Sequence, residues 1–218
     1  MAPHIAPTAA VLLALSVPGT GAQGALRVRA SSIVAPCVEA AARAWPPARG
    51  PMQVETAAPL APGPADVLVA SAVELTRALE GGTAELDSDI DVARVPWVMQ
   101  VRTGGPATIR RAADLAGSGA EVTVPDSPAA YEARRWAAAA SGGRVREAKG
   151  RELREAAVAL VPLSLAGAGE RIDVDVPPIV VRAAVALAPA RPAEARAFVA
   201  FLASEPGQKA FAECRVVQ

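Results

Sequence analysis

Strand-like and helix-like segments alternate along almost the whole chain, and this alternation limits the folds open to it. Apolar runs typical of buried strands recur from residue 25 to residue 187, and amphipathic helix patterns follow many of them. Strands are predicted at residues 25–30, 52–56, 66–70, 92–102, 121–124, 158–161 and 179–187. Helices are predicted at residues 33–45, 72–80, 109–115, 128–140, 150–155, 192–203 and 205–213. This order predicts an α/β fold in which mostly parallel sheets are flanked by helices.

Two strand-like connections divide these segments into two sets, so the sequence predicts two lobes. The connections lie near Val92–Pro96 and Val176–Ile179, which places the first and last segments in the same lobe. Residues 23–92 and 179–218 form the first predicted lobe, and residues 93–178 form the second. A chain organised in this way is expected to hold a ligand between its lobes, at the carboxyl ends of the strands.

The N-terminus has the pattern of a cleavable signal peptide. An apolar run covers residues 9–17, which is too short to span a bilayer as a helix, and Pro18-Gly19 then breaks it. Thr20-Gly21-Ala22 offers small residues at the positions that a signal peptidase reads, so residues 1–22 are predicted to be removed after Ala22. The alternative is a buried strand or helix of the mature fold. The signal peptide predicts export, and we expect a periplasmic protein.

Charge and histidine content argue against several classes of function. The chain has 22 basic and 22 acidic residues, and its arginines are spread in pairs, which is unlike a nucleic-acid-binding surface. His4 is the only histidine and lies in the predicted signal peptide, so the mature chain has none for a catalytic triad or a histidine metal site. Asp173 and Asp175 lie on a predicted linker with no partner acid or base. We therefore expect no enzyme, no metal and no cofactor.

The chain has two cysteines, Cys37 and Cys214, with no spacing typical of a metal site. In an oxidising compartment, two cysteines in one exported chain favour a disulfide between them. The alternative is a pair of buried free thiols that act as small hydrophobic side chains.

Small hydroxyl residues stand between a strand and a helix at two places, one in each predicted lobe. Ser31 and Ser32 follow the strand at residues 25–30, and Ser127 follows the strand at 121–124 as an N-cap before Pro128. The N-terminus of a helix carries unpaired N–H groups and a partial positive charge, so hydroxyls and amides there can hold an anion. Each serine alone is explained by capping. The occurrence in both lobes favours a shared anion site.

Four segments spread along nearly the whole mature chain share a further pattern: Leu26–Ile33, Pro64–Ala72, Asp126–Ala133 and Ala197–Phe211. In this order they resemble periplasmic molybdate-binding proteins, which are type II solute-binding proteins of ABC importers. The last is similar to the C-terminal signature of the superfamily. The resemblance implies the two-lobed fold of type II periplasmic binding proteins, closing on a tetrahedral oxyanion. It also implies a monomer whose partners are a small anionic ligand and the membrane permease of an ABC importer.

The resemblance also carries residue roles onto this sequence. It implies that Ser32, beside Ser31, donates its hydroxyl, that Ala129 and Ala130 donate backbone amides from the other lobe, and that Tyr131 lies next to them.

Two donors of the family pattern are changed. Thr56-Ala57-Ala58 stands in place of a Ser-Ser-Gly loop, and Leu160–Leu163 lacks the family's tyrosine, so Thr56 and Ser164 are the expected substitutes. Two alternatives follow from these changes: an organic ligand on the same fold, or a sensor or partner role without transport.

Overall fold

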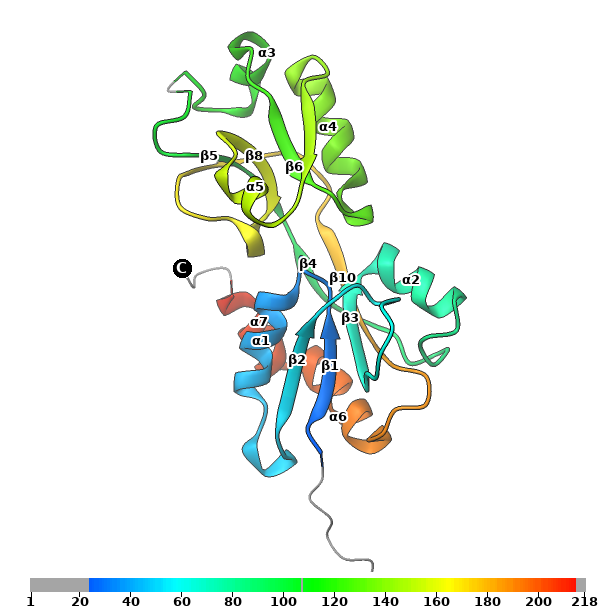
Figure 1. Ribbon diagram of the computed structural model, residues 1–218. Helices are drawn as coiled ribbons and strands as arrows, with labels where there is room; N and C mark the ends of the chain where they lie inside the picture. Colours follow the sequence, from blue (N-terminus) through cyan, green and yellow to red (C-terminus); the bar gives the residue numbers. More distant parts are fainter. Residues whose placement is uncertain (1–23, 107, 215–218) are drawn as a thin grey trace, which may run out of the picture.

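A computed structural model describes residues 24–106 and 108–214, which form two sheets with helices packed on both faces of each. Figure 1 shows the two sheets one above the other, joined by chain segments that cross between them. The predicted signal peptide, residues 1–22, lies outside the described residues. Among the described residues, none of the helices combines the length and the apolar character needed to span a bilayer.

The first sheet has the strand order β2-β1-β3-β10-β4. Its strands are β1 (Leu26–Ala30), β2 (Met52–Thr56), β3 (Val67–Ser71), β4 (Ile90–Val95) and β10 (Ile179–Val185). β1 pairs in parallel with β2 and β3, whereas β10 pairs antiparallel with β3 and β4. Only β10 therefore runs against the other four strands.

The second sheet repeats this arrangement in the order β7-β6-β8-β5-β9. Its strands are β5 (Trp97–Val101), β6 (Val122–Pro125), β7 (Val145–Ala148), β8 (Val158–Pro162) and β9 (Glu170–Asp173). β6 is parallel to β7 and β8, and β5 is antiparallel to β8 and β9. The strands of each sheet run in one direction except for one, so the prediction of mostly parallel sheets is correct. The exception is β10 in the first sheet and β5 in the second, and these two strands make the sheets mixed.

Helices cover both faces of each sheet. In the first, α1 (Ala35–Ala44), α6 (Pro192–Ala203) and α7 (Glu205–Glu213) pack on one face and α2 (Ala72–Glu80) on the other. In the second, α3 (Leu115–Ser118) and α4 (Tyr131–Ser141) pack on one face and α5 (Gly150–Glu155) on the other. We call each sheet with its helices the first and the second lobe. The predicted boundaries at residues 92/93 and 178/179 stay a prediction, and β4 continues to Val95 in the first sheet.

Side-chain caps set several helix boundaries. Ser71 and Glu74 form the predicted capping box of α2, in which Ser71 Oγ accepts the Glu74 N–H and the Glu74 carboxylate accepts the Ser71 N–H. Ser127 begins the 3₁₀ turn η3 (Pro128–Ala130) that leads into α4, as predicted. Ser204 occupies the N-cap position of α7, but its hydroxyl donates to the carbonyl of Phe201 at the end of α6 instead of capping α7.

The helix predicted at residues 109–115 begins later than expected. A 3₁₀ turn, η2 (Ala112–Asp114), precedes the short α3. The Asp114 carboxylate accepts the backbone N–H groups of Arg110 and Arg111, at 2.9 and 3.0 Å. Because Asp114 reaches back to these N–H groups, Arg111 is the N-cap, and the helical segment begins at Ala112, later than predicted.

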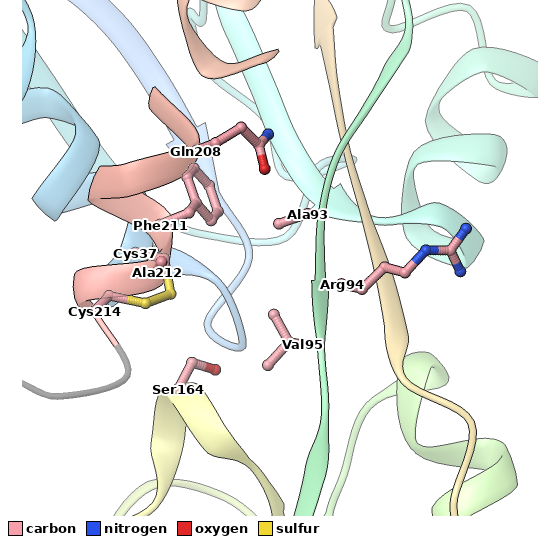
Figure 2. Close-up of a pocket in the computed structure, with 9 residues that line it drawn as sticks. All are labelled: Cys37, Ala93, Arg94, Val95, Ser164, Gln208, Phe211, Ala212 and Cys214. Carbon is pink, nitrogen blue, oxygen red and sulfur yellow. A yellow bond between two sulfur atoms is a disulfide. The ribbon is translucent and has the colours of Figure 1, made fainter. Parts of the chain in front are cut away.

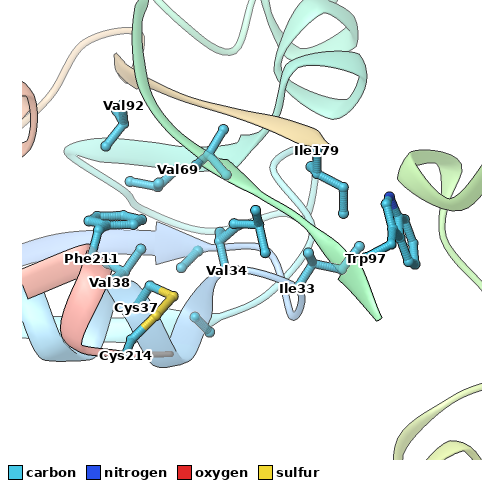
Figure 3. Close-up of a cluster of buried hydrophobic side chains, with 14 of the residues drawn as sticks. Ile33, Val34, Cys37, Val38, Val69, Val92, Trp97, Ile179, Phe211 and Cys214 are labelled. Atoms are coloured by element: carbon cyan, nitrogen blue, oxygen red, sulfur yellow. A yellow bond between two sulfur atoms is a disulfide. The ribbon is translucent and has the colours of Figure 1, made fainter. Parts of the chain in front are cut away.

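A continuous apolar cluster connects the helices of the first lobe with the crossing between lobes. Figure 3 shows Val38 and Phe211, from α1 and α7, near Val92 of β4, with Trp97 at the start of β5. The disulfide between Cys37 and Cys214 borders this cluster, with a Cα–Cα distance of 5.0 Å, and it ties α7 to α1. The predicted cysteine pairing is thus present in the structure.

Candidate ligand-binding site

The first strand–helix junction places two serines at the carboxyl end of β1. The Ser31 N–H donates to the carbonyl of Val69, and the Ser31 carbonyl accepts the N–H groups of Val34 and Ala35, which turns the chain into α1. Ser31 is 2% exposed, and its Oγ has no hydrogen-bond partner among the described residues. A buried hydroxyl without a partner is uncommon in native proteins. Ser32, next in the chain, is exposed.

The second junction places Ser127 at the carboxyl end of β6. Its Oγ accepts the Ala129 N–H at 3.2 Å, and its carbonyl accepts the Ala130 N–H at 3.0 Å. The two amides predicted to hold a ligand are thus engaged by Ser127, and η3, to which they belong, packs against α2 of the first lobe.

One cavity of about 550 Å³ brings these junctions together, because Ser32 and Ser127 both line it. It lies along the face of the second sheet that α5 covers. Its apolar lining comes mainly from Ile33, Pro125, Leu153, Val161 and Leu165. Its polar lining comes from Ser32, Gln100, Arg102, Asp126, Ser127, Lys149 and Arg154. Ser32 and Ser127, one from each junction, therefore border the same crevice, and the shared anion site stays a prediction.

Positive charge predominates around this cavity. The cations of Arg102, Lys149 and Arg154 outnumber the single carboxylate of Asp126. Lys149 Nζ lies 2.9 Å from Asp126 Oδ2, and Arg102 donates through Nη1 to the carbonyl of Glu155 at 3.0 Å. Arg154 is exposed and has no hydrogen bond or ion pair to any described residue. A crevice lined by one sign of charge attracts ligands of the other sign, here anions.

Gln100 holds one wall of the cavity in place. Its Oε1 accepts the Gly167 N–H at 2.8 Å, and its Nε2 donates to the carbonyl of Ala168 at 2.7 Å. Gln100 is buried, so these two bonds fix the segment that runs from η4 (Leu163–Leu165) to β9 against the sheet. Both polar ends of the amide are satisfied, and its role is to shape the wall.

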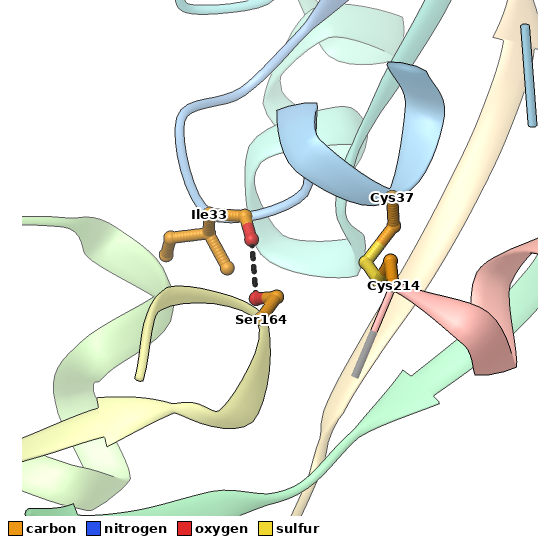
Figure 4. The surroundings of a disulfide bond; sticks show 4 residues. All are labelled: Ile33, Cys37, Ser164 and Cys214. Atoms are coloured by element: carbon orange, nitrogen blue, oxygen red, sulfur yellow. Dashed lines mark hydrogen bonds between the residues drawn. A yellow bond between two sulfur atoms is a disulfide. The ribbon is translucent and has the colours of Figure 1, made fainter. Parts of the chain in front are cut away.

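Six of the eight predicted site residues do not line this cavity: Ser31, Ala129 and Ala130 at the two junctions, and Thr56, Tyr131 and Ser164. Thr56 is exposed at the end of β2 and does not line it. Tyr131 is 58% exposed, and the Arg135 guanidinium lies 5.9 Å from the centre of its ring. Ser164 donates through Oγ to the carbonyl of Ile33 at 2.7 Å, a bond between the two lobes that Figure 4 shows near the disulfide. Their predicted contacts with a ligand stay predictions.

A second, smaller cavity of about 120 Å³ lies between α7, β4 and the tip of the second lobe that bears Ser164. Figure 2 shows Ser164, Val95, Phe211 and the Cys37–Cys214 disulfide around it. Its volume is large enough to hold water. Ser164 thus borders a small space at the crossing between lobes, apart from the crevice that Ser32 and Ser127 share.

Sequence reasoning missed the cations of the cavity and its apolar wall. Lys149 follows β7 as Ser127 follows β6, so recognition of the edge strand β7 would have placed it at the same edge of the sheet. No sequence pattern marks Arg102 or Arg154 as lining one space. Among residues 24–106 and 108–214, no group of three or more His, Cys, Asp or Glu side chains could hold a metal ion.

Several solved structures share the fold of this chain. The periplasmic molybdate-binding protein of Azotobacter vinelandii aligns with a TM-score of 0.71 at 14% identity, over 87% of this chain and 97% of its own. The sulfate-binding protein SubI of Mycobacterium tuberculosis H37Rv aligns with a TM-score of 0.66 at 22% identity, over 87% and 85%. Peb3 of Campylobacter jejuni aligns with a TM-score of 0.66 at 11% identity, over 87% and 97%.

These structures identify the class of fold, which is the two-lobed α/β fold of periplasmic solute-binding proteins. The resemblance to periplasmic molybdate-binding proteins, read from four sequence segments, is confirmed at the level of the fold. No family model matches the sequence, and no curated protein sequence matches it.

Proposed function

We propose that this chain is an exported solute-binding protein that captures a small anion and delivers it to the membrane permease of an ABC importer. The observation that carries the proposal is the single cavity shared by Ser32 of the first lobe and Ser127 of the second. A ligand bound there touches both lobes, so binding favours the closed arrangement over an open one. The protein binds its ligand and does no chemistry on it.

Two features support an anion as the ligand. Ser32 lines the cavity with a hydroxyl side chain, and the Arg154 side chain, which also lines it, has no counter-charge among the described residues. Hydroxyl and guanidinium groups donate hydrogen bonds to oxyanions and carboxylates. A tetrahedral oxyanion such as molybdate is the simplest ligand of this class, as the sequence resemblance implies.

Calorimetric titration of the purified protein with molybdate, sulfate and small organic anions tests this function. Ser32→Ala and Ser127→Ala should each weaken binding by about two- to tenfold, because each removes one neutral hydrogen-bonding group. Ser71→Ala is the matched control, since Ser71 also caps a helix but does not line the cavity. It should lower stability as Ser127→Ala does and leave affinity unchanged. Absence of binding to every anion, or turnover of any of them, would overturn the proposal.

A further inference from the structure

The large cavity is elongated along the strands of the second sheet. Ser127 and Lys149 follow the carboxyl ends of β6 and β7, which is the edge nearest the first lobe. Arg102 follows β5 at the opposite edge, where Val101 pairs with Val158 at the start of β8. The four residue steps from Trp97 to Val101 span about 13 Å at the usual rise of a strand. The cavity thus reaches from the edge nearest the first lobe to the far edge of the sheet.

One wall of the cavity is apolar. Leu153 of α5 and Val161 of β8 are buried side chains of one hydrophobic cluster, and half-buried Leu165 completes the wall. Removal of apolar ligand surface from water at these side chains contributes to affinity. A bare oxyanion gains nothing from such a wall.

Two arginines line the cavity near the C-terminal end of α5. Arg102 is held there by its hydrogen bond to the carbonyl of Glu155, and Arg154 precedes Glu155 in the chain. The Glu155 carboxylate lies 2.7 Å from Arg151 Nε, outside the cavity lining. Like charges that line one space repel unless an anion lies between them. A carboxylate is the planar, bidentate partner that arginine binds best.

The volume of the cavity also favours a ligand larger than a tetrahedral oxyanion. A cavity of about 550 Å³ falls within the range of about 300–1,000 Å³ that organic ligands of moderate size occupy. A tetrahedral oxyanion has few atoms and is much smaller than this volume. The rest of the space is lined by apolar side chains that such an ion cannot contact.

We propose that the ligand of this cavity is an organic acid with an extended apolar chain. Its carboxylate lies between Arg102 and Arg154, its chain lies against Leu153, Val161 and Leu165, and its other end lies toward Ser32 and Ser127. This inference rests on the proposed binding function of the same cavity and names the class of its ligand.

Calorimetric titration with butanoate, octanoate, 1-octanol, molybdate and sulfate tests the class of ligand. Octanoate should bind more tightly than butanoate, by about fourfold for each methylene group that becomes buried. The alcohol keeps the chain and lacks the charge, so it should bind at least about tenfold more weakly than octanoate.

Two pairs of variants locate the ligand. Arg154→Gln should weaken octanoate binding by about tenfold, whereas Arg151→Gln, on the same helix but outside the lining, should not change it. Leu165→Asn should weaken octanoate binding and leave butanoate nearly unchanged. Leu187→Asn is its control, because Leu187 is 58% exposed and lies outside the cavity lining.

The outcomes separate this inference from the proposed function. Tight binding of molybdate or sulfate without octanoate binding overturns the organic ligand and leaves the anion-binding function standing. Equal effects of Arg154→Gln and Arg151→Gln, or equal affinity for octanoate and 1-octanol, also overturn the inference. If no probe binds, the ligand class and the binding function fail together.

Discussion

The two lobes share one strand order but are stabilised by different means. In the first lobe, the rings of Trp45, Phe198 and Phe201 pack together with centroid distances of 5.2 to 6.0 Å, and a disulfide ties α7 to α1. In the second lobe, α4 contributes mainly alanines to the core, and ion pairs on the surface connect its elements. The first lobe therefore has the cluster of packed aromatic rings and the covalent link.

This difference bears on where a ligand can be held. Nearly all of the cavity lining comes from the second lobe, and the first contributes only Ser32 and Ile33. Packing of large rings fills space efficiently, so the aromatic cluster leaves little room for a ligand. The small side chains of the second lobe, such as Ala148, leave space between the sheet and α5. One lobe thus supplies stability and the other supplies the shape of the site.

Removal of the disulfide should produce the largest effect and should act on the first lobe. The bond closes a sequence separation of 177 residues, and the chain-entropy account predicts that its loss lowers the free energy of unfolding by about 4–5 kcal/mol. Denaturant unfolding of a Cys37→Ser, Cys214→Ser double variant measures this loss. Hydrogen exchange should increase most in α1 and α7. A reductant should destabilise the natural protein and leave the variant unchanged. An equal increase of hydrogen exchange in both lobes would contradict the view that the disulfide stabilises mainly the first lobe.

Truncation of Phe198 should be the next largest change. Phe198 is fully buried and packs edge-on against Trp45, so Phe198→Ala should cost about 3–5 kcal/mol of unfolding free energy. Leu160→Ala is the counterpart in the second lobe, where a smaller buried side chain is removed and about 2–5 kcal/mol is expected. Denaturant unfolding of both variants gives the comparison. A greater loss for Leu160→Ala would show that the second lobe is the better packed of the two.

Much of this fold could be predicted, because the residues that mark the ends of helices agree with the periodic spacing of apolar residues along the chain. The bounds of α2, α5, α6 and α7 match their predictions, since a cap, a glycine or a proline marks their ends. The edge strands β7 and β9 were missed. They are short, and Arg146, Glu147, Glu170 and Arg171 make them polar because an edge strand faces solvent.

The site could be predicted only in part. Ser32 and Ser127 were found because both follow parallel strands, whose carboxyl ends gather at one edge of a sheet. Arg102 and Arg154 could not be found in this way. The two residues line one cavity because β5 runs in the reversed direction and because α5 packs back across the sheet. The local sequence predicts neither feature. Ser164 was predicted as a ligand donor, which stays a prediction; in the structure its hydroxyl donates to the Ile33 carbonyl of the other lobe.

Loss of a surface ion pair in the second lobe should have a small effect. Arg134 of α4 lies 2.9 Å from Glu147 of β7, and both side chains are more than a third exposed. Exposed pairs of this kind contribute about 0–1 kcal/mol, so Glu147→Gln should lower the free energy of unfolding by no more than about 1 kcal/mol. Glu132→Gln, which removes the 3.5 Å pair with Arg135 within α4, is the control. A loss of several kcal/mol for Glu147→Gln would contradict the view that the second lobe is held weakly by its surface charges.

Acid sensitivity gives the finest comparison, because within residues 24–212 each lobe has one carboxyl group with a lowered pKa. In the first lobe, the pKa of the Glu194 carboxyl group is lowered, first by a hydrogen bond from the backbone N–H of Glu194 itself. The second cause is the hydrogen bond from Arg191 Nη2 to Glu194 Oε1, at 3.0 Å. In the second lobe, the Arg110 N–H and then the Arg111 side chain lower the pKa of Asp114.

A lowered pKa in the folded state means that each group stabilises the fold fully above its ordinary pKa. That stabilisation is lost as the pH falls through the lowered value. Glu194→Gln and Asp114→Asn should therefore each flatten the acid limb of a plot of unfolding free energy against pH. The Glu194 variant should flatten it more, because Arg191 is 9% exposed and less screened by solvent than Arg111, which is 79% exposed. Denaturant unfolding between pH 3 and pH 7 measures both slopes. A larger change for Asp114→Asn than for Glu194→Gln would contradict the expectation that the first lobe has the stronger acid sensitivity.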